Sequence, residues 1–436
     1  MLKSRWFAPA IFAAALLGWL LATTLVEFAP LLADVLDRLT QFIKTAFFAA
    51  LKMIIAPLIF FSLVAGVLQL RKSERMGRLG GVALGYYIAT TSIAITIGLI
   101  VVFFIHPWTA TPPLIEDPTA LGGAVPVNAQ LINPADGSTW SLLNNLAQRM
   151  LVNPFNALAE MNVLGILVTA VIFGLGIALT VGEDSVIPTF FDEMTAVIFR
   201  VSGWVLSTLP LGIFAIAYQL AGQLNFETLV SLGQLAGVVF GATLVHGLVV
   251  LPLIAWWATG SPPWQFLRDG SQPLVTAFIT SSSAATLPLS MATADKLGVP
   301  RAKSAFVLPL GATANMDGTA LFEGIAAVYL AYMFGIELGT TGIIAVFIVA
   351  MLSSVGAPGM PSGSMAGMQM VLLAVGIPLE AIGLLLLIER PLDTFRTAVN
   401  VEGDLVGTLV AHRFTEGDGS TDITKTLANE PQSELA

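Results

Sequence analysis

Five polar residues near the C-terminal end of the sequence combine charge with helical spacing. They are Asp393, Arg396, Thr397, Asn400 and Asp404, and long apolar runs precede and follow them. Relative to Asp393 the others are displaced by 3, 4, 7 and 11 positions, so on a helix all of them share one face. An ionisable group at mid-bilayer costs roughly 2.5–3.5 kcal/mol on insertion scales and is retained where it faces a cavity inside the protein. This face is therefore predicted to bind charged partners, and a structural Asp–Arg pair between two helices is the alternative.

A second polar group occupies residues 311–319. Thr313, Asn315, Asp317 and Thr319 take every second position, a spacing that a regular helix would scatter over all its faces. Local unwinding is therefore predicted, and it would free backbone carbonyl oxygens to join Asn315 and Asp317 in an all-oxygen site. Hard cations choose such ligands. Polar residues packed beside a helix kink are the alternative.

The charges of these two groups suggest their ligands. Asp317 and Asp404 are separate rather than clustered, which favours sodium over calcium, and two cations would neutralise them. Asp393 and Arg396 then remain, and they suit a solute that carries an ammonium and a carboxylate group. A second carboxylate on the solute could meet Asn400 and free backbone N–H groups.

The composition indicates the class of protein that must position these residues. The chain has 436 residues, of which 56% are hydrophobic and 11% charged, and its mean hydropathy is +0.84. This profile is typical of a polytopic membrane protein. Cysteine is absent, which excludes disulfides, thiolate metal sites and cysteine nucleophiles. The formal charge of −9 and the pI near 4.8 argue against nucleic acid as a partner.

Eight apolar runs are long enough to cross a bilayer as helices. They cover residues 7–29, 42–70, 79–105, 160–181, 195–221, 228–258, 304–334 and 378–411. Two further apolar stretches, 264–294 and 340–374, are interrupted midway at 281–288 and 354–364 by serine, glycine and proline. Lipid does not tolerate exposed irregular backbone, so each stretch is predicted to be a helical hairpin that enters the membrane halfway and returns.

The basic residues and the two hairpins predict the topology. Lys and Arg before residue 6, at 71–78, at 296–303 and after 412 fall on one side of the membrane, so both termini are expected in the cytoplasm. Each hairpin precedes a span marked by polar residues, and the two units enter from opposite sides. Paired interrupted segments indicate a transporter site at the midplane of an inverted repeat. The predicted fold is an all-α polytopic membrane protein with eight transmembrane helices and two re-entrant hairpins.

Four motifs carry a resemblance to a family of transporters. They are SSSAATLP at 281–288, ANMDGTALFE at 314–323, SVGAPGMP at 354–361 and DTFRTAVNVEGD at 393–404. Over residues 5–413 the chain resembles the sodium-coupled glutamate/aspartate transporters, the dicarboxylate/amino acid:cation symporters. The resemblance implies a homotrimer in the bacterial inner membrane that works as an elevator. Residues 1–78 and 106–222 would form a scaffold, residues 79–105 and 223–413 a transport domain, and residues 414–436 a disordered cytoplasmic tail.

The resemblance also implies roles for individual residues. Asp393 would hold the substrate ammonium and Arg396 its side-chain carboxylate. The remaining substrate-binding positions would be Ser282, Ser283, Met316, Thr319, Gly359, Met360, Thr397 and Asn400. The sodium ions would be held by Tyr87, Thr90, Thr91, Gly311, Thr313, Asn315, Asp317, Ser354, Val355, Ala357, Asn400 and Asp404. Glu323 matches a position associated with proton coupling and is a candidate proton carrier, or else a polar residue lining the interface between spans.

The chain departs from the family's pattern at four positions. Members carry an additional arginine either at the start of the serine run or directly after the binding-site aspartate, and here these positions are Ser281 and Thr394. Ala284 replaces a serine or glycine, and Glu389 stands where aspartate is usual. The missing arginine bears on coupling and on transport rate.

The resulting prediction is a secondary active symporter that imports glutamate or aspartate with sodium, and with protons if Glu323 carries them. A C4-dicarboxylate:cation symporter is the alternative. An intramembrane serine hydrolase, with Ser362 or Ser364 as nucleophile and His246 as base, is a remote alternative from another class. A channel is less compatible, because the sequence shows no ring of charges or filter repeat. No enzymatic activity and no organic cofactor are expected.

Overall fold

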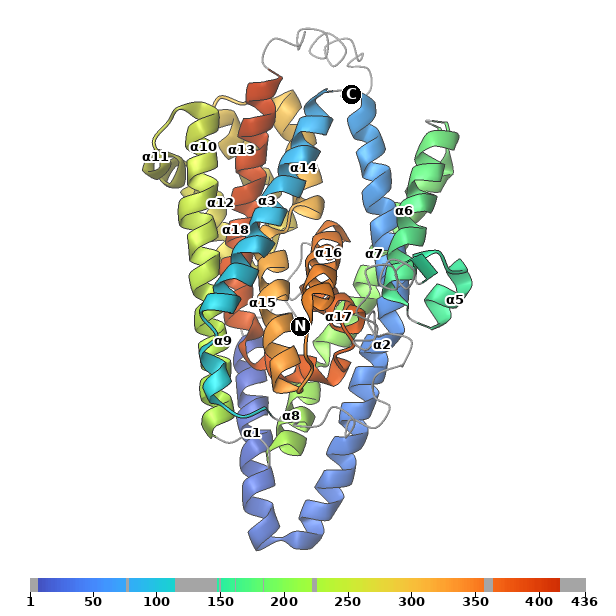
Figure 1. The fold of residues 1–436 in the computed structure, drawn as a ribbon, viewed down its shortest axis with the longest axis vertical. Helices are drawn as coiled ribbons and strands as arrows, with labels where there is room; N and C mark the ends of the chain where they lie inside the picture. Colours follow the sequence, from blue (N-terminus) through green and yellow to red (C-terminus); the bar gives the residue numbers. More distant parts are fainter. Residues whose placement is uncertain are drawn as a thin grey trace, which may run out of the picture.

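The computed structural model describes residues 7–75, 78–113, 147–148, 150–160, 162–182, 184–221, 226–356 and 364–415, which are almost entirely helical (Figure 1). The first half of the chain contains α1 (Phe7–Phe28), α2 (Pro30–Arg75), α3 (Arg78–Phe104), η1 (Pro107–Ala110), α5 (Pro154–Ala159), α6 (Val163–Thr180), α7 (Val186–Ser207) and α8 (Leu209–Leu220). The second half contains α9 (Phe226–Val245), η4 (His246–Val250), α10 (Leu251–Thr259), α11 (Pro263–Asp269), α12 (Ser271–Thr280), α13 (Ser283–Lys296), α14 (Arg301–Ala314), α15 (Asp317–Met333), α16 (Thr340–Gly356), α17 (Ser364–Ala374), η5 (Leu379–Ala381) and α18 (Ile382–Phe414).

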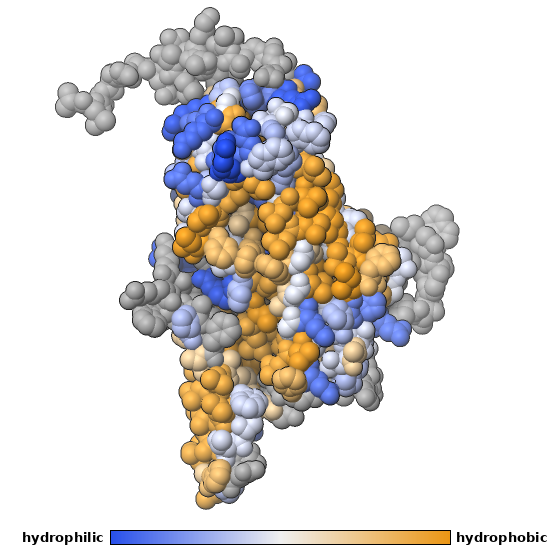
Figure 2. Space-filling view, turned by 90° about the vertical axis from the view of Figure 1, so that its left-hand side faces the viewer, coloured by the Kyte–Doolittle hydropathy of each residue, from blue (hydrophilic) through white to orange (hydrophobic). Residues whose placement is uncertain are grey.

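The surface of this helical assembly is apolar over a large area. Phe28 and Leu31 are 82% and 86% exposed, and Figure 2 shows a broad hydrophobic band over the middle of one face, with hydrophilic residues gathered at one end. Among the described residues, Arg78–Ala110 and Phe226–Thr259 are long and apolar enough to cross a membrane, and one bent helix pair would make a third such span. These features are those of a helical membrane protein.

The expected span at 195–221 is two helices rather than one. α7 begins earlier, at Val186, and its axis makes an angle of 48° with that of α8. Pro210 lies in the first turn of α8, where it can donate no backbone hydrogen bond to the preceding turn and its ring crowds the carbonyl four residues earlier. The apolar run is continuous through this point, which explains why hydropathy alone predicts a single span.

The first interrupted stretch contains a break, but of the expected 281–288 only Ser281 and Ser282 are non-helical. α12 ends at Thr280 and α13 begins at Ser283, and the two helices pack against each other. Ser281 between them has φ 48° and ψ 39°, a left-handed conformation that ends α12. The side chain of Ser282 then caps α13 by accepting a hydrogen bond from the N–H of Ala285 at 3.2 Å.

The second interrupted stretch also consists of two helices that pack together, α16 and α17. Of the expected interruption at 354–364, residues 354–356 are still helical in α16 and Ser364 begins α17, while residues 357–363 lie outside the described residues. The span that follows the first hairpin is interrupted as well: α14 ends at Ala314 and α15 begins at Asp317. The predicted unwinding is therefore confirmed, but it is confined to Asn315 and Met316, since Thr313 and Asp317 are helical.

The helices form two sets that pack mainly among themselves. α2 packs with α6, α7 and α8, and α1 packs with α8. In the other set, α18 runs lengthwise among α3, α9, α10, α12, α13, α14 and α15 (Figure 1). Its middle is thereby enclosed by helices, and 23 of its residues are buried. The polar stretch of the sequence thus lies at the centre of this second set.

Candidate ion- and substrate-binding site

The polar face of α18 is buried along its whole length. Asp393, Arg396, Thr397, Asn400 and Asp404 are at most 6% exposed and belong to one continuous helix, although Pro391 lies inside it. The prediction that these residues share one inward face is confirmed. Charged groups at such depth need partners, because an isolated buried charge is strongly unfavourable.

The break between α14 and α15 lies against the C-terminal part of this polar face, around Asn400 and Asp404. The contacts there form an oxygen-rich cluster. Asn315 donates a hydrogen bond from Nδ2 to Oδ1 of Asp404 at 3.1 Å. Thr90 of α3 approaches Oδ1 of Asn315 at 3.5 Å. Tyr87, one turn earlier on α3, donates to the carbonyl of Val307 at 2.9 Å. Segments that are distant in sequence therefore bring carboxylate, amide, hydroxyl and carbonyl oxygens together, the ligand types that hard cations prefer.

Two glycines make this close approach possible. A Cβ atom on Gly311 would lie 2.6 Å from Oδ1 of Asp404 and 2.7 Å from the hydroxyl of Tyr87. A Cβ atom on Gly318 would lie 2.7 Å from the backbone carbonyl oxygen of Arg396. Any side chain at either position would separate α14 or α15 from its neighbours, so glycine is required by packing.

Asp317, the first residue of α15, has a different partner at each carboxylate oxygen. Thr91 donates to Oδ1 at 2.7 Å, and Nε2 of His246 lies 3.0 Å from Oδ2. Both His246 and Asp317 have fully buried side chains. His246 begins η4, a π-helical turn between α9 and α10, and such turns are frequent at functional sites. The sequence identified His246 only as a candidate base, and its contact with a candidate sodium ligand was missed.

Nearer the N-terminal end of α18, acidic and basic side chains alternate along the sequence. Nη2 of Arg396 lies 3.1 Å from Oε1 of Glu389 and 3.4 Å from Oδ1 of Asp393. The same nitrogen donates to Oγ of Ser364 on α17 at 2.9 Å, and Ser364 donates to Glu389 at 3.3 Å. The guanidinium carbon of Arg396 stacks 4.0 Å from the centre of the Phe322 ring.

Arg396 retains hydrogen-bonding capacity within this network. Its Nε and Nη1 atoms are buried and have no hydrogen-bond partner among the described residues. An N–H donor on a guanidinium forms a strong, charge-assisted hydrogen bond with a carboxylate oxygen. Arg396 is thus held in place through Nη2 and presents its other donors for a carboxylate ligand.

Asn400 connects the two polar regions. Its Oδ1 accepts a hydrogen bond from the backbone N–H of Gly318 at 2.8 Å, and its Nδ2 donates to Thr319 at 3.4 Å. The N–H of Gly318 belongs to the first turn of α15, where backbone donors lack partners within the helix. Asn400 therefore caps α15 and fixes it against α18, between Asp404 and Arg396.

Other predicted site residues are buried or, for Thr313 and Ser282, half-buried, and several of them make hydrogen bonds elsewhere. Thr397 donates to the carbonyl of Asp393 at 2.7 Å, Thr313 to that of Leu310 at 3.0 Å, and Ser354 to that of Met351 at 2.7 Å. Ser283 and Met316 are 4% and 3% exposed. Ser282 caps α13. Ala357, Gly359 and Met360 lie outside the described residues, and Val355 is helical without a described side chain.

Glu323 is fully buried on α15. Its Oε2 accepts a hydrogen bond from Ser353 of α16, while Oε1 has no hydrogen-bond partner among the described residues. A Cβ atom on Gly367 of α17 would collide with Oε1, 2.1 Å away. Glu323 thus lies where α15 meets both helices of the second hairpin.

The contacts separate the members of the proposed serine-hydrolase site. His246 contacts Asp317, and Ser364 contacts Arg396 and Glu389; Ser362 lies outside the described residues. No nucleophile–base hydrogen bond joins His246 to Ser364, so the described geometry provides no such catalytic pair.

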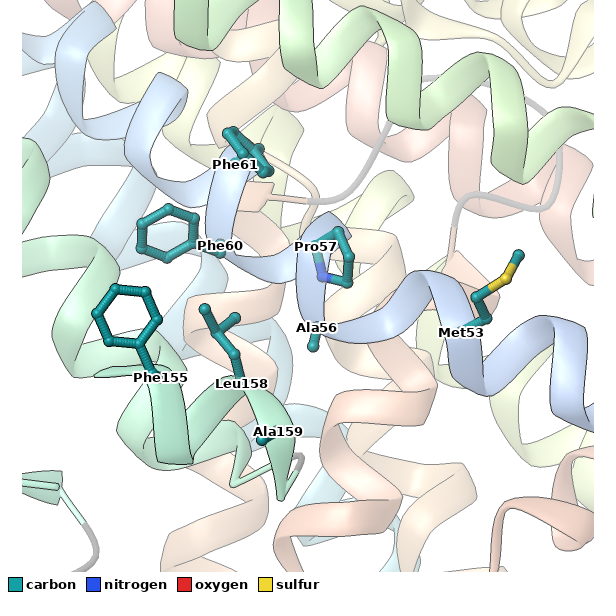
Figure 3. A pocket seen from close by; sticks show the side chains of 8 residues that line it. All are labelled: Met53, Ala56, Pro57, Phe60, Phe61, Phe155, Leu158 and Ala159. Atoms are coloured by element: carbon teal, nitrogen blue, oxygen red, sulfur yellow. The ribbon is translucent and has the colours of Figure 1, made fainter. Parts of the chain in front are cut away.

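A pocket elsewhere in the structure has a different character. It lies between α2 and α5 and is lined by Met53, Ala56, Pro57, Phe60, Phe61, Phe155, Leu158 and Ala159 (Figure 3). None of these side chains is charged, so the pocket offers no counter-ion to a charged solute.

Comparison with other proteins identifies the family. Residues 7–414 match the sodium:dicarboxylate symporter family. The chain is 32% identical over 403 residues to an excitatory amino acid transporter of Caenorhabditis elegans, covering 84% of this chain and 80% of that one. It is 31% identical over 406 residues to excitatory amino acid transporter 3 of Homo sapiens, covering 84% and 77%.

The similarity extends to transporters named for other substrates. Over 418 residues the chain is 32% identical to the neutral amino acid transporter B(0) of Mus musculus, covering 88% of this chain and 74% of that one. These proteins are transporters rather than enzymes, which sets the hydrolase alternative aside. The chain belongs to the sodium:dicarboxylate symporter family.

Proposed function

We propose that this protein is a secondary active symporter that imports acidic amino acids together with sodium. The observation that carries the proposal is Arg396, which is 1% exposed and has two donor nitrogens without a partner among the described residues. Asp393 lies beside it on the same face. A guanidinium and a carboxylate at this depth suit the side-chain carboxylate and the ammonium group of glutamate or aspartate.

The second part of the proposal concerns sodium. The oxygen atoms of Asn315, Asp317 and Asp404, with the hydroxyls of α3, would hold the co-transported ions. Asp317 and Asp404 contact no lysine or arginine among the described residues. A carboxylate without a bound cation would raise the free energy of moving this part of the protein across the bilayer, and a bound cation would remove that cost. Transport of the substrate would thereby be coupled to transport of sodium.

The third part concerns architecture. Eight transmembrane spans, two re-entrant hairpins in an inverted repeat and cytoplasmic termini are proposed from the hydropathy, the basic residues and the breaks. The packing of α1, α2, α6, α7 and α8 apart from the helices around α18 supports a scaffold and a transport domain that slides as an elevator. A homotrimer in the bacterial inner membrane and a cytoplasmic tail at 414–436 complete the proposal.

Glu323 is proposed as a proton carrier, supported by its burial against the second hairpin. Replacing Glu323 with Gln keeps the shape of the side chain and removes its exchangeable charge. We expect uptake by Glu323→Gln to respond to a sodium gradient but no longer to a proton gradient. Equal stimulation of the wild-type protein and the variant by an imposed proton gradient would remove Glu323 from this role.

A C4-dicarboxylate substrate is the second candidate, and one contact favours it. Asp393 already has a cationic partner in Arg390, 3.4 Å away, so a solute without an ammonium group would leave this pair intact. Uptake of labelled aspartate, glutamate and succinate into proteoliposomes, with sodium and proton gradients imposed separately, distinguishes the two. A purified protein that binds neither sodium nor any of these anions would refute the proposed symport.

A further inference from the structure

Arg390 lies three residues before Asp393 on α18, and the roles described so far leave it unused. Its Nη1 is 3.4 Å from Oδ2 of Asp393, while Nη2 of Arg396 is 3.4 Å from Oδ1. The two oxygens of Asp393 therefore face two different guanidinium groups.

The two arginines are held to very different degrees. Arg396 has a side chain that is 1% exposed, pairs also with Glu389 and stacks on Phe322. Arg390 has a side chain that is 18% exposed, so its guanidinium group is within reach of solvent. Long basic side chains extend readily to place a charged end group in water. Of these two arginines, Arg390 is the one that another cation can displace from Asp393.

The four charges also balance. Glu389 and Asp393 carry two negative charges, and Arg390 and Arg396 two positive ones. When no substrate is bound, this group is neutral as a whole. An ammonium group entering opposite Asp393 meets a carboxylate oxygen that already has a cationic partner, so the two positive groups repel and compete for it.

We propose that Arg390 is a specificity-determining residue that competes with the substrate ammonium group for Asp393. This inference rests on the proposed function, because it requires a substrate that contacts Asp393. An acidic amino acid displaces the Arg390 guanidinium towards solvent when it binds. A dicarboxylate without an ammonium group binds Arg396 and leaves the Arg390–Asp393 pair in place. Arg390 thereby lowers the affinity for amino acids relative to dicarboxylates of the same length.

The test compares aspartate and succinate binding to the purified full-length protein in saturating sodium by isothermal titration calorimetry. In Arg390→Met the competing charge is gone, and we expect the Kd for aspartate to fall about two- to fivefold, as for a partly exposed ion pair. The Kd for succinate should stay the same or rise. The sign is diagnostic, because removing a positive charge from an anion-binding site would otherwise weaken the binding of both anions.

Three further variants make the result interpretable. Arg390→Gln removes the same charge with a different side chain and should reproduce the gain, while Arg390→Lys keeps the charge and should resemble the wild-type protein. Arg301→Met is a matched control, since Arg301 lies 3.5 Å from Asp295 in a pair far more exposed, at 78% for the arginine, and both Kd values should be unchanged. Unchanged or weaker aspartate binding in both Arg390→Met and Arg390→Gln would overturn the competition. Failure of the wild-type protein to bind either anion would instead refute the proposed function, and this inference with it.

Discussion

Two clusters that both include residues of α18 compensate buried charge in different ways. The first, here called the acidic cluster, consists of Asp317 and Asp404 with Asn315, Thr91 and His246. The second, here called the paired cluster, consists of Glu389, Arg390, Asp393 and Arg396. In the acidic cluster the carboxylates meet hydroxyl, amide and imidazole groups and no lysine or arginine among the described residues. In the paired cluster each acid faces a guanidinium.

This difference indicates what each cluster requires from outside. Hydrogen bonds from neutral groups offset only part of the free energy that a buried carboxylate loses on leaving water, so the acidic cluster gains most from a mobile cation. In the paired cluster each charge already has a partner of opposite sign, so an entering ammonium group must compete with Arg390 for Asp393, while Arg396 keeps donors for a carboxylate. The acidic cluster thus gains a cation by addition, whereas the paired cluster exposes an entering ammonium group to competition.

The largest effect is expected from breaking the paired cluster at Arg396. Arg396→Ala removes the carboxylate partner and leaves Glu389 and Asp393 without it, and such truncations of buried charge pairs cost about 2–5 kcal/mol. Aspartate and glutamate binding should fall by at least about thirtyfold, while neutral amino acids can still bind through Asp393. Uptake competition with labelled aspartate and with a neutral amino acid measures both.

Arg396→Lys is the matched control for this change. It retains the positive charge but loses the planar pair of donors, so it should recover only part of the binding. Wild-type aspartate affinity in Arg396→Ala would show that Arg396 does not bind the substrate carboxylate.

A smaller effect is expected from breaking the acidic cluster at Asp404. Asp404→Asn preserves the shape of the side chain and removes the charge that a cation would neutralise. Because interactions with charged groups contribute about 1.5–3 kcal/mol each, the apparent affinity for sodium should fall about ten- to a hundredfold. Sodium titrations of aspartate binding give this value. Asp295→Asn, at a far more exposed ion pair, should leave the sodium dependence unchanged, and so would Asp404→Asn if Asp404 held no ion.

The smallest effect is expected at His246, which orients Asp317 within the acidic cluster. His246→Leu removes the contact to Oδ2, and the loss of one buried hydrogen bond should weaken sodium binding about three- to tenfold. His246→Gln can still donate to Asp317 and should restore most of the affinity. If Leu and Gln have equal effects on sodium affinity, His246 acts through packing and not through this hydrogen bond.

The sequence predicted those features that depend on local spacing. The offsets from Asp393 to Asp404 place these residues on one face of whatever helix contains them, and α18 is that helix. The alternating polar residues at 313–319 predicted a break, which the structure confines to Asn315 and Met316. The serines at 281–283 predicted the break between α12 and α13. In each case, neighbouring residues suffice to determine the conformation.

Features that depend on helix packing were not accessible in this way. The contact of His246 with Asp317 joins residues 71 positions apart, and that of Ser364 with Arg396 joins residues 32 positions apart. The sequence indicated His246 and Ser364 only as base and candidate nucleophile of the remote hydrolase alternative, and it did not connect them with the acids and the arginine that they contact. The bend between α7 and α8 was missed because the apolar run continues through it.

By itself, the sequence determined that this chain is a helical membrane protein whose buried charges lie on one helical face, because hydropathy and periodicity are properties of neighbouring residues. Only the tertiary structure decided which of these charges compensate one another. Partner choice depends on how closely α3, α14, α15 and α17 approach α18, and glycines such as Gly311 and Gly318 permit that approach. The acids near Arg390 and Arg396 therefore belong to a paired cluster, whereas Asp404 and Asp317, which have other helical neighbours, belong to the acidic cluster.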